Sequence, residues 1–265
     1  FPRARGFDHH YGHYSALIDY FTHYRDEVLD WHRNGRPVIE EGYSTYLLAG
    51  EFERLLDSYD GSKPFFFYIP FNAVHGPKQA PQEVVDKYIQ LGHSDPQLAA
   101  CVECMDIAIG RMVKALAQHG LRDNTLIAFC SDNGGPKSRG NGPLKGWKSA
   151  YHEGGIRVLA LMNWPGKIKA GTIVTEPLHI VDIYPTFVNL AGGTLDQPLP
   201  LDGLDAWATI TKAAPSPHDE IVHGPETIRK GDWKLIQGHA EYYNWKAEVT
   251  QLYNIAQDPY EQNNL

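Results

Sequence analysis

The chain has 265 residues, a formal net charge of −8 and 42% hydrophobic residues. This length suits one large domain, or one domain with a small appendage, and the acidic balance argues against a nucleic-acid surface. No apolar run of about 18 residues occurs, so no segment is expected to span a membrane.

The first half of the chain predicts two helices and one buried strand. Residues 43–59 place apolar side chains at helical spacing, and residues 95–120 form the clearest helix, with Asp95 as its N-cap. Between these helices, the continuous apolar run KPFFFYIPF at residues 63–71 predicts a buried strand. This strand leads into the turn NAVHGP, which carries His75.

The second half predicts two more buried strands, at residues 124–131 and 156–166, and a helix at residues 179–193. A Pro-rich break follows near Pro215, and Trp233 then begins a short alternating pattern that is typical of a small antiparallel sheet. The alternation of strands and helices before this break predicts an α/β core.

We therefore expect two parts of unequal size. Residues 1–214 should form an α/β domain with a mainly parallel sheet flanked by helices, and residues 215–265 a small antiparallel-sheet subdomain. In parallel sheets, ligands gather beyond the carboxyl ends of the strands.

Polar side chains follow two of the predicted strands at this position. His75 follows residues 63–71, the pair Asp132–Asn133 follows the next strand, and Lys148 stands on the loop after that pair. Carboxylate and amide oxygens suit Ca²⁺ or Mg²⁺, lysine binds sulfate or phosphate, and histidine can exchange a proton with a leaving oxygen. The set suits metal-assisted hydrolysis of a sulfate or phosphate ester, although SDNGG taken alone also fits an ordinary turn.

Seven segments, in a fixed order along the chain, resemble the sulfatase family of the alkaline-phosphatase-like superfamily, and their spelling around GNGPLKGWK is most similar to arylsulfatases of the N-acetylgalactosamine-4-sulfatase type. The segments are RGFDHHYG, PFFFYIPFNAVHGP, FCSDNGG, PLKGWKSAYHEGGIR, DIYPTFVNLAGG, LDGLD, and the tail from IRKGDWKLI to QLYNIAQDPYEQNNL. The resemblance implies an alkaline-phosphatase-like α/β fold and a sulfated carbohydrate or an aryl sulfate as substrate.

The resemblance also implies roles for individual residues. Asp132 and Asn133 would be two ligands of the active-site cation, calcium in most of the family, with magnesium as the alternative. Lys148 would hold the sulfate, since it stands five positions before the E-G-G-x-R motif, and Lys145 is its rival. His75 would contact the sulfate or the leaving oxygen.

One part of the family pattern has no match in these 265 residues. Sulfatases carry two further metal-binding aspartates and a C/S-x-P-x-R motif whose Cys or Ser becomes formylglycine, the nucleophile. None of the three cysteines, Cys101, Cys104 and Cys130, begins such a motif. We expect those elements to lie upstream, so this chain alone should bind a divalent cation weakly and should not turn over sulfate esters. An unpaired sheet edge would favour homo-oligomers.

Two other functions stay open at this stage. One is a phosphatase or phosphonate hydrolase of the same superfamily, and the other is a non-catalytic sulfatase-like protein that binds glycans. The sequence has no N-x-S/T sequon, which favours a bacterial periplasmic or secreted protein over a lysosomal glycoprotein.

Overall fold

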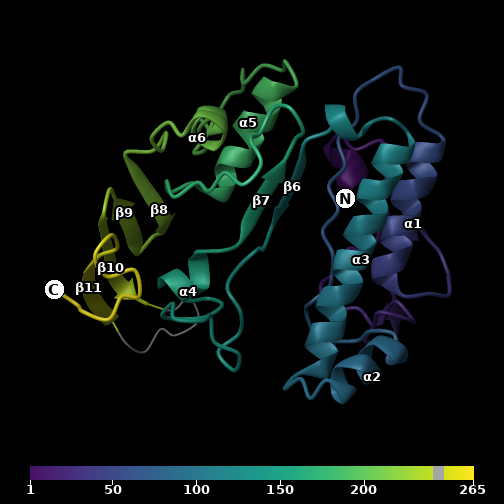
Figure 1. Cartoon of the computed structure of the whole chain (residues 1–265), viewed down its shortest axis with the longest axis horizontal. Helices are drawn as coiled ribbons and strands as arrows, with labels where there is room; N and C mark the ends of the chain where they lie inside the picture. The colour runs from purple at the N-terminus through teal and green to yellow at the C-terminus, as the bar shows by residue number, and fades with distance from the viewer. Residues whose placement is uncertain (241–247) are drawn as a thin grey trace. The chain divides into compact units, whose positions relative to one another are not determined.

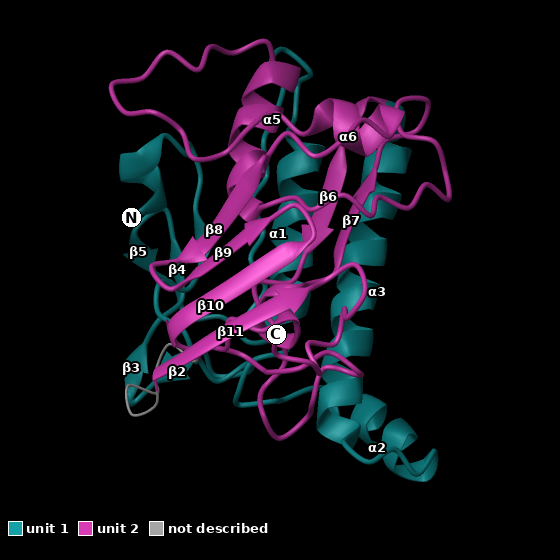
Figure 2. Cartoon of the chain, turned by 90° about the vertical axis from the view of Figure 1, so that its left-hand side faces the viewer, with its two compact units in different colours: residues 1–123 teal, residues 124–265 magenta. Residues whose placement is uncertain are grey.

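The computed structural model describes residues 1–240 and 248–265, and the chain divides into two compact units, residues 1–123 and residues 124–265 (Figure 2). Within the described residues, no helix has the length and apolar character needed to cross a membrane.

Unit 1 is built around α1 (Ser44–Asp57) and α3 (Pro96–Gln118), which pack along each other, while α2 (Gln82–Gln90) packs against α3 (Figure 1). The Asp95 carboxylate accepts a hydrogen bond from the Leu98 N–H at 3.3 Å, so the predicted cap is confirmed together with both predicted helices. The remaining elements of unit 1 are a 3-10 turn η1 (Pro2–Arg5) and the strands β1 (Tyr11–Gly12), β2 (Tyr24–Arg25), β3 (Val28–Leu29), β4 (His32–Arg33) and β5 (Arg36–Pro37).

The buried face of α3 consists mainly of small side chains, with Ala100, Cys101, Cys104 and Ala108 all fully buried. Small residues at this spacing let the neighbouring helices approach closely. Both cysteines are free thiols, and burial raises the pKa of Cys101 to about 11.

The predicted strand at residues 63–71 is not a strand in the described structure. Its side chains nevertheless alternate in exposure as in an extended segment, since Phe66 and Tyr68 are exposed while Phe65, Phe67 and Ile69 are half-buried. Phe67 packs edge-on against Phe52 of α1, with ring centroids 4.7 Å apart. The apolar run therefore packs through aromatic contacts on a helix instead of joining a ladder of hydrogen bonds.

Unit 2 begins with the pair β6 (Ile127–Cys130) and β7 (Ala160–Asn163), which runs antiparallel. This corrects the prediction of a mainly parallel sheet, since every strand pair among the described residues is antiparallel. The N–H of Ser131 donates to the Leu159 carbonyl at 3.0 Å and continues the same antiparallel register by one residue beyond the two strands.

The C-terminal sheet has the order β11-β10-β9-β8, all antiparallel, as predicted (Figure 2). Its strands are β8 (Glu220–Gly224), β9 (Thr227–Lys230), β10 (Trp233–His239) and β11 (Glu248–Asn254). The expected alternation in β10 is present, but the buried side chains are Lys234 and Ile236, both 0% exposed, while Trp233 is 47% exposed. The proposed subdomain boundary at 214/215 remains a prediction, and residues 241–247 of that subdomain lie outside the described residues.

The predicted helix at residues 179–193 appears as a 3-10 turn η3 (Ile180–Asp182) continued by α5 (Ile183–Leu190). Asp182 stands at the N-cap, but its carboxylate accepts hydrogen bonds from other segments: the Leu204 N–H at 3.0 Å and the His218 ring at 2.7 Å. The other elements of unit 2 are η2 (Arg122–Asn124, at the unit boundary), α4 (Glu153–Ile156) and α6 (Trp207–Lys212).

Candidate functional site

The predicted metal ligands lie directly after β6. Asp132 is exposed and Asn133 is half-buried, with its Nδ2 donating to the Gly134 carbonyl at 3.0 Å. The Ser131 hydroxyl donates to the Asn133 carbonyl at 3.1 Å and so holds the turn from the strand into the loop. Strand β6 therefore presents one carboxylate and one amide at its end.

Glycine lets this turn pack against the E-G-G motif. The Gly134 N–H donates to the Gly155 carbonyl at 3.0 Å, and a Cβ on Gly134 would overlap the Gly154 carbonyl oxygen. A Cβ on Gly154 would lie 2.5 Å from the Lys145 carbonyl oxygen. Only glycine permits so close a contact between backbones, which explains the glycines of both motifs.

Lys148 belongs to the same packed loop. Its backbone N–H donates to the Gly135 carbonyl at 2.8 Å, so the segment after Asp132–Asn133 and the segment that carries Lys148 are joined directly. The Lys148 side chain is half-buried. The structure thus brings three of the four predicted site residues onto one loop system of unit 2.

The rival cation, Lys145, is engaged in another contact. Its ammonium group donates to the Tyr253 hydroxyl at 2.9 Å and to the Glu261 carbonyl at 3.2 Å. These bonds attach Lys145 to the C-terminal sheet and to the tail that follows it.

His75 lies in unit 1, in the turn after residues 63–71. Its N–H donates to the Asn72 carbonyl at 2.9 Å, its own carbonyl accepts from the Tyr20 hydroxyl at 2.8 Å, and its side chain is exposed. The turn is therefore held by its backbone, which leaves the imidazole on the surface of unit 1. That His75 meets the Asp132 loop remains a prediction.

The donor set matches a hard divalent cation in kind but not in number. Among residues 1–240 and 248–265, no three or more His, Cys, Asp or Glu side chains are grouped so that they could hold a metal ion. Since Ca²⁺ takes six to eight oxygens, Asp132 and Asn133 fit as part of such a shell and do not complete it.

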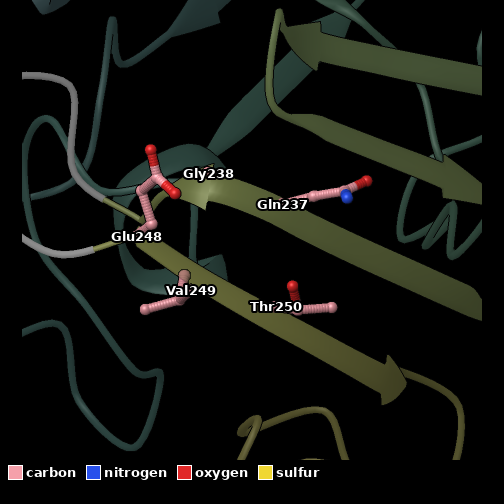
Figure 3. Close-up of a pocket in the computed structure, with 5 residues that line it drawn as sticks. All are labelled: Gln237, Gly238, Glu248, Val249 and Thr250. Carbon is pink, nitrogen blue, oxygen red and sulfur yellow. The ribbon is translucent and has the colours of Figure 1, made fainter.

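Figure 3 shows a pocket on the C-terminal sheet, lined by Gln237, Gly238, Glu248, Val249 and Thr250. Its single charged side chain is the acidic Glu248, which repels an anion, and none of the predicted site residues lines it. This pocket does not suit a sulfate group.

Sequence patterns did not reveal two buried side chains that contact Glu153 of the E-G-G motif, namely Lys234 and Glu261. Lys234 read as a polar position of a surface strand, and Glu261 as part of a tail motif. The available signal was that the E-G-G motif and the tail segment DPYEQNNL occur together in the family pattern.

Comparison with known proteins shows the family to which the chain belongs. The model of the family "Sulfatase" matches residues 1–193, and the chain belongs to the sulfatase family. It is 31% identical to arylsulfatase J of Mus musculus, a match that covers 100% of this chain and 54% of that protein. A sulfatase of Formosa agariphila is 28% identical, covering 93% of this chain and 51% of that one. The chain thus spans about half the length of these relatives.

Solved sulfatase structures share the fold. The crystal structure of Ps i-CgsB has a TM-score of 0.88 and 30% identity, covering 100% of this chain and 63% of that one, and has also been solved in complex with k-i-k-neocarrahexaose. PsFucS1 sulfatase from Pseudoalteromonas sp. has a TM-score of 0.69 and 26% identity over 88% of this chain. The chain therefore has the alkaline-phosphatase-like architecture of sulfatases, with a small antiparallel sheet near its C-terminal end.

Proposed function

We propose that this chain supplies the sulfate-holding loop and part of the cation shell of a sulfuric ester hydrolase that acts on a sulfated carbohydrate. The observation that carries the proposal is the 2.8 Å bond from the Lys148 N–H to the Gly135 carbonyl, which ties the lysine to the Asp132–Asn133 turn. A divalent cation and a sulfate group can bind side by side only where the oxygen ligands of the cation and the ammonium group that binds the sulfate are held close together.

Each predicted residue has a distinct role in this proposal. Asp132 and Asn133 contribute oxygen ligands to Ca²⁺, or to Mg²⁺ in its place, and Lys148 donates to a sulfate oxygen. His75 donates a proton toward the leaving oxygen. When bound, the cation would withdraw charge from the ester oxygens.

The carbohydrate part of the proposal is supported by Ps i-CgsB, which has been solved with an oligosaccharide and is 30% identical to this chain. A formylglycine precursor motif does not occur in the 265 residues. We therefore propose anion binding as this chain's own measurable property, and turnover as a property that also needs a nucleophile. A periplasmic or secreted location fits a polysaccharide substrate.

Calorimetric titration of the full chain with sodium sulfate, in the presence of Ca²⁺, tests the proposal. Lys148→Ala should weaken sulfate binding about tenfold, since one charge-assisted hydrogen bond is worth about 1.4 kcal/mol in a site of this kind. The matched control is Lys137→Ala, because Lys137 lies on the same loop and stacks over the Trp147 ring at 4.2 Å. Equal losses in both variants would contradict the proposal.

Two further titrations use the same protein. Ca²⁺ alone should bind with a Kd on the order of 1 mM, as expected for an incomplete shell, and Asp132→Asn should weaken it further. Titration with inorganic phosphate in place of sulfate distinguishes a sulfatase site from the site of a phosphatase or phosphonate hydrolase. Tighter binding of phosphate than of sulfate would favour the second kind of site.

A further inference from the structure

Three charged side chains are buried together beneath the E-G-G motif. The Lys234 ammonium lies 2.9 Å from Glu153 Oε1 and 2.9 Å from Glu261 Oε1, and the three side chains are 0%, 4% and 0% exposed. The second oxygen of Glu261 accepts the Glu153 backbone N–H at 2.7 Å. We refer to Lys234, Glu153 and Glu261 as the buried ion triad.

The triad joins three segments that are distant in the sequence. Glu153 begins α4 and directly precedes the two glycines that pack against Gly134. Lys234 lies in β10, and Glu261 lies in the tail after β11. The tail is folded back over the sheet, because the Leu265 N–H donates to the Leu252 carbonyl at 3.1 Å.

Contacts beside the triad also join the segment before the E-G-G motif to the C-terminal sheet. Tyr253 is the cross-strand partner of Lys234, and its hydroxyl accepts from Lys145 at 2.9 Å. The His152 ring lies 2.8 Å from the Gln251 side-chain oxygen, and the Tyr151 N–H donates to the Ala240 carbonyl at 2.9 Å. Residues 145–153 are therefore attached to β10, β11 and the tail at each of several successive positions.

A charged triad fixes position more strictly than an apolar contact of the same size. Two carboxylates share one ammonium group, so the triad carries an excess negative charge in the interior, and such groups are weak contributors to net stability. A slip of β10 by one residue would move Lys234 to the opposite face, leaving Glu261 buried without a cation and Glu153 with only Arg157, 3.9 Å away. Only one register of β10 under the loop is therefore compatible with burial.

We propose that Lys234 and Glu261 are positioning residues for the anion-binding loop. They fix the position of the E-G-G turn relative to β10 and the tail and, through this turn, the position of Lys148. The route is short, because Gly154 N–H donates to the Lys145 carbonyl at 2.6 Å and Lys148 N–H to the Gly135 carbonyl at 2.8 Å. The statement about Lys148 rests on the proposed function, whereas the statement about the loop backbone does not.

Hydrogen–deuterium exchange of the full chain, followed by NMR, tests the role of the triad. Lys234→Met removes the charge and keeps an unbranched side chain that is one heavy atom shorter. It should speed exchange at the Gly134, Lys148 and Gly154 amides at least tenfold more than at the amides that pair β8 with β9. The matched control is Lys230→Met on β9, where the lysine is exposed and pairs with Glu220 at 3.5 Å; this variant should leave all these amides unchanged.

Two results would overturn the proposal. One is unchanged exchange at the three loop amides in Lys234→Met, and the other is an equal acceleration across the β8–β9 pair, which would show that the variant only lowers the stability of the whole unit. If Lys234→Met does not fold, Glu261→Gln decides, because it keeps the shape and an oxygen that can accept the Glu153 N–H. This variant should accelerate the same amides about threefold.

Sulfate titration of the same variants separates this inference from the proposed function. Lys234→Met should weaken sulfate binding about tenfold while Lys230→Met does not. If the parent chain binds no sulfate, the proposed function fails, and the exchange result still decides whether the triad positions the loop. If the parent binds sulfate and Lys234→Met binds it equally well, the positioning role is refuted.

Discussion

Both units bury a charged network, but the two networks have opposite ratios of charge. In unit 1, one carboxylate, Glu51, is surrounded by Arg33, Arg54 and His9, at distances of 2.9, 2.7 and 2.8 Å. In unit 2, one ammonium group, Lys234, serves two carboxylates.

The difference appears in the pKa values. Burial alone would raise the pKa of Glu51, but hydrogen bonds and charge from Arg54 and Arg33 lower it to about 2. For Glu261 burial is the largest effect and raises the pKa, and Lys234 only partly offsets it. The arginines of unit 1 are 35% and 53% exposed, so water also solvates that network. The network of unit 1, with its partly exposed arginines, should therefore tolerate the loss of one charged side chain. In unit 2, Glu153 has a second, exposed partner in Arg157 at 3.9 Å, but the buried Glu261 relies on Lys234.

Of the three variants, Lys234→Met should cause the largest loss in the free energy of unfolding. Removing Lys234 leaves Glu261 buried without its cation and Glu153 with only Arg157 at 3.9 Å, and we expect a loss of about 3–5 kcal/mol in the free energy of unfolding at pH 7. The loss should shrink at acidic pH, because a carboxyl whose folded pKa is raised takes up its proton early. Urea denaturation at pH 7 and pH 5 measures it, and adding Glu261→Gln should cost less than the sum of the two single changes.

His223 gives the next largest effect, because it lies close enough to Lys234 to sense its charge. Burial, then the positive charge of Lys234, lowers its pKa from 6.5 to about 4. A histidine with a lowered folded pKa contributes stability that is complete above pH 6.5 and is lost as the pH falls toward 4. We expect up to about 3 kcal/mol to be lost over that interval. Unfolding measured across the interval should show a flatter pH dependence in His223→Gln, and an unchanged slope would contradict the assignment.

Glu51→Gln should give the smallest effect of the three. Its partners are partly solvated, so we expect a loss of about 1–2 kcal/mol at pH 7 despite the buried carboxylate. With a folded pKa of about 2, Glu51 contributes stability above pH 4.5 that is lost only as the pH falls toward 2. The parent and the variant should therefore converge in thermal stability near pH 2; a loss as large as that of Lys234→Met would remove the contrast between the two networks.

Local signals in the sequence predicted the helices and the C-terminal sheet. The α3 helix has a strong cap at Asp95 and a long periodic pattern, both of which depend only on near neighbours. The apolar run at residues 63–71 failed as a strand because a strand also needs a partner for its ladder, which no local pattern specifies. The direction of the β6–β7 pair was mispredicted for a related reason, since no local pattern specifies which strand pairs with another or in which direction it runs.

For the candidate site, too, the sequence predicted what local motifs specify and not the pairing of distant residues. Asp132, Asn133 and Lys148 follow from motif spacing, and the structure joins them through one loop system. Lys234 could not be read in the same way, because a lysine in an alternating strand normally faces water and its partner Glu153 lies 81 positions away. Pairing at that separation is a property of the tertiary fold.

The folded-back tail has a consequence for synthesis on the ribosome. Glu153 is made 108 positions before Glu261, the residue that accepts its backbone N–H. At translation rates of about 5–20 residues per second, the E-G-G turn waits roughly 5–20 s for that partner. During this interval the glycine-rich loop is a nascent segment that lacks its carboxylate anchor, so this part of unit 2 is completed late, after the helices of unit 1 have already left the ribosome.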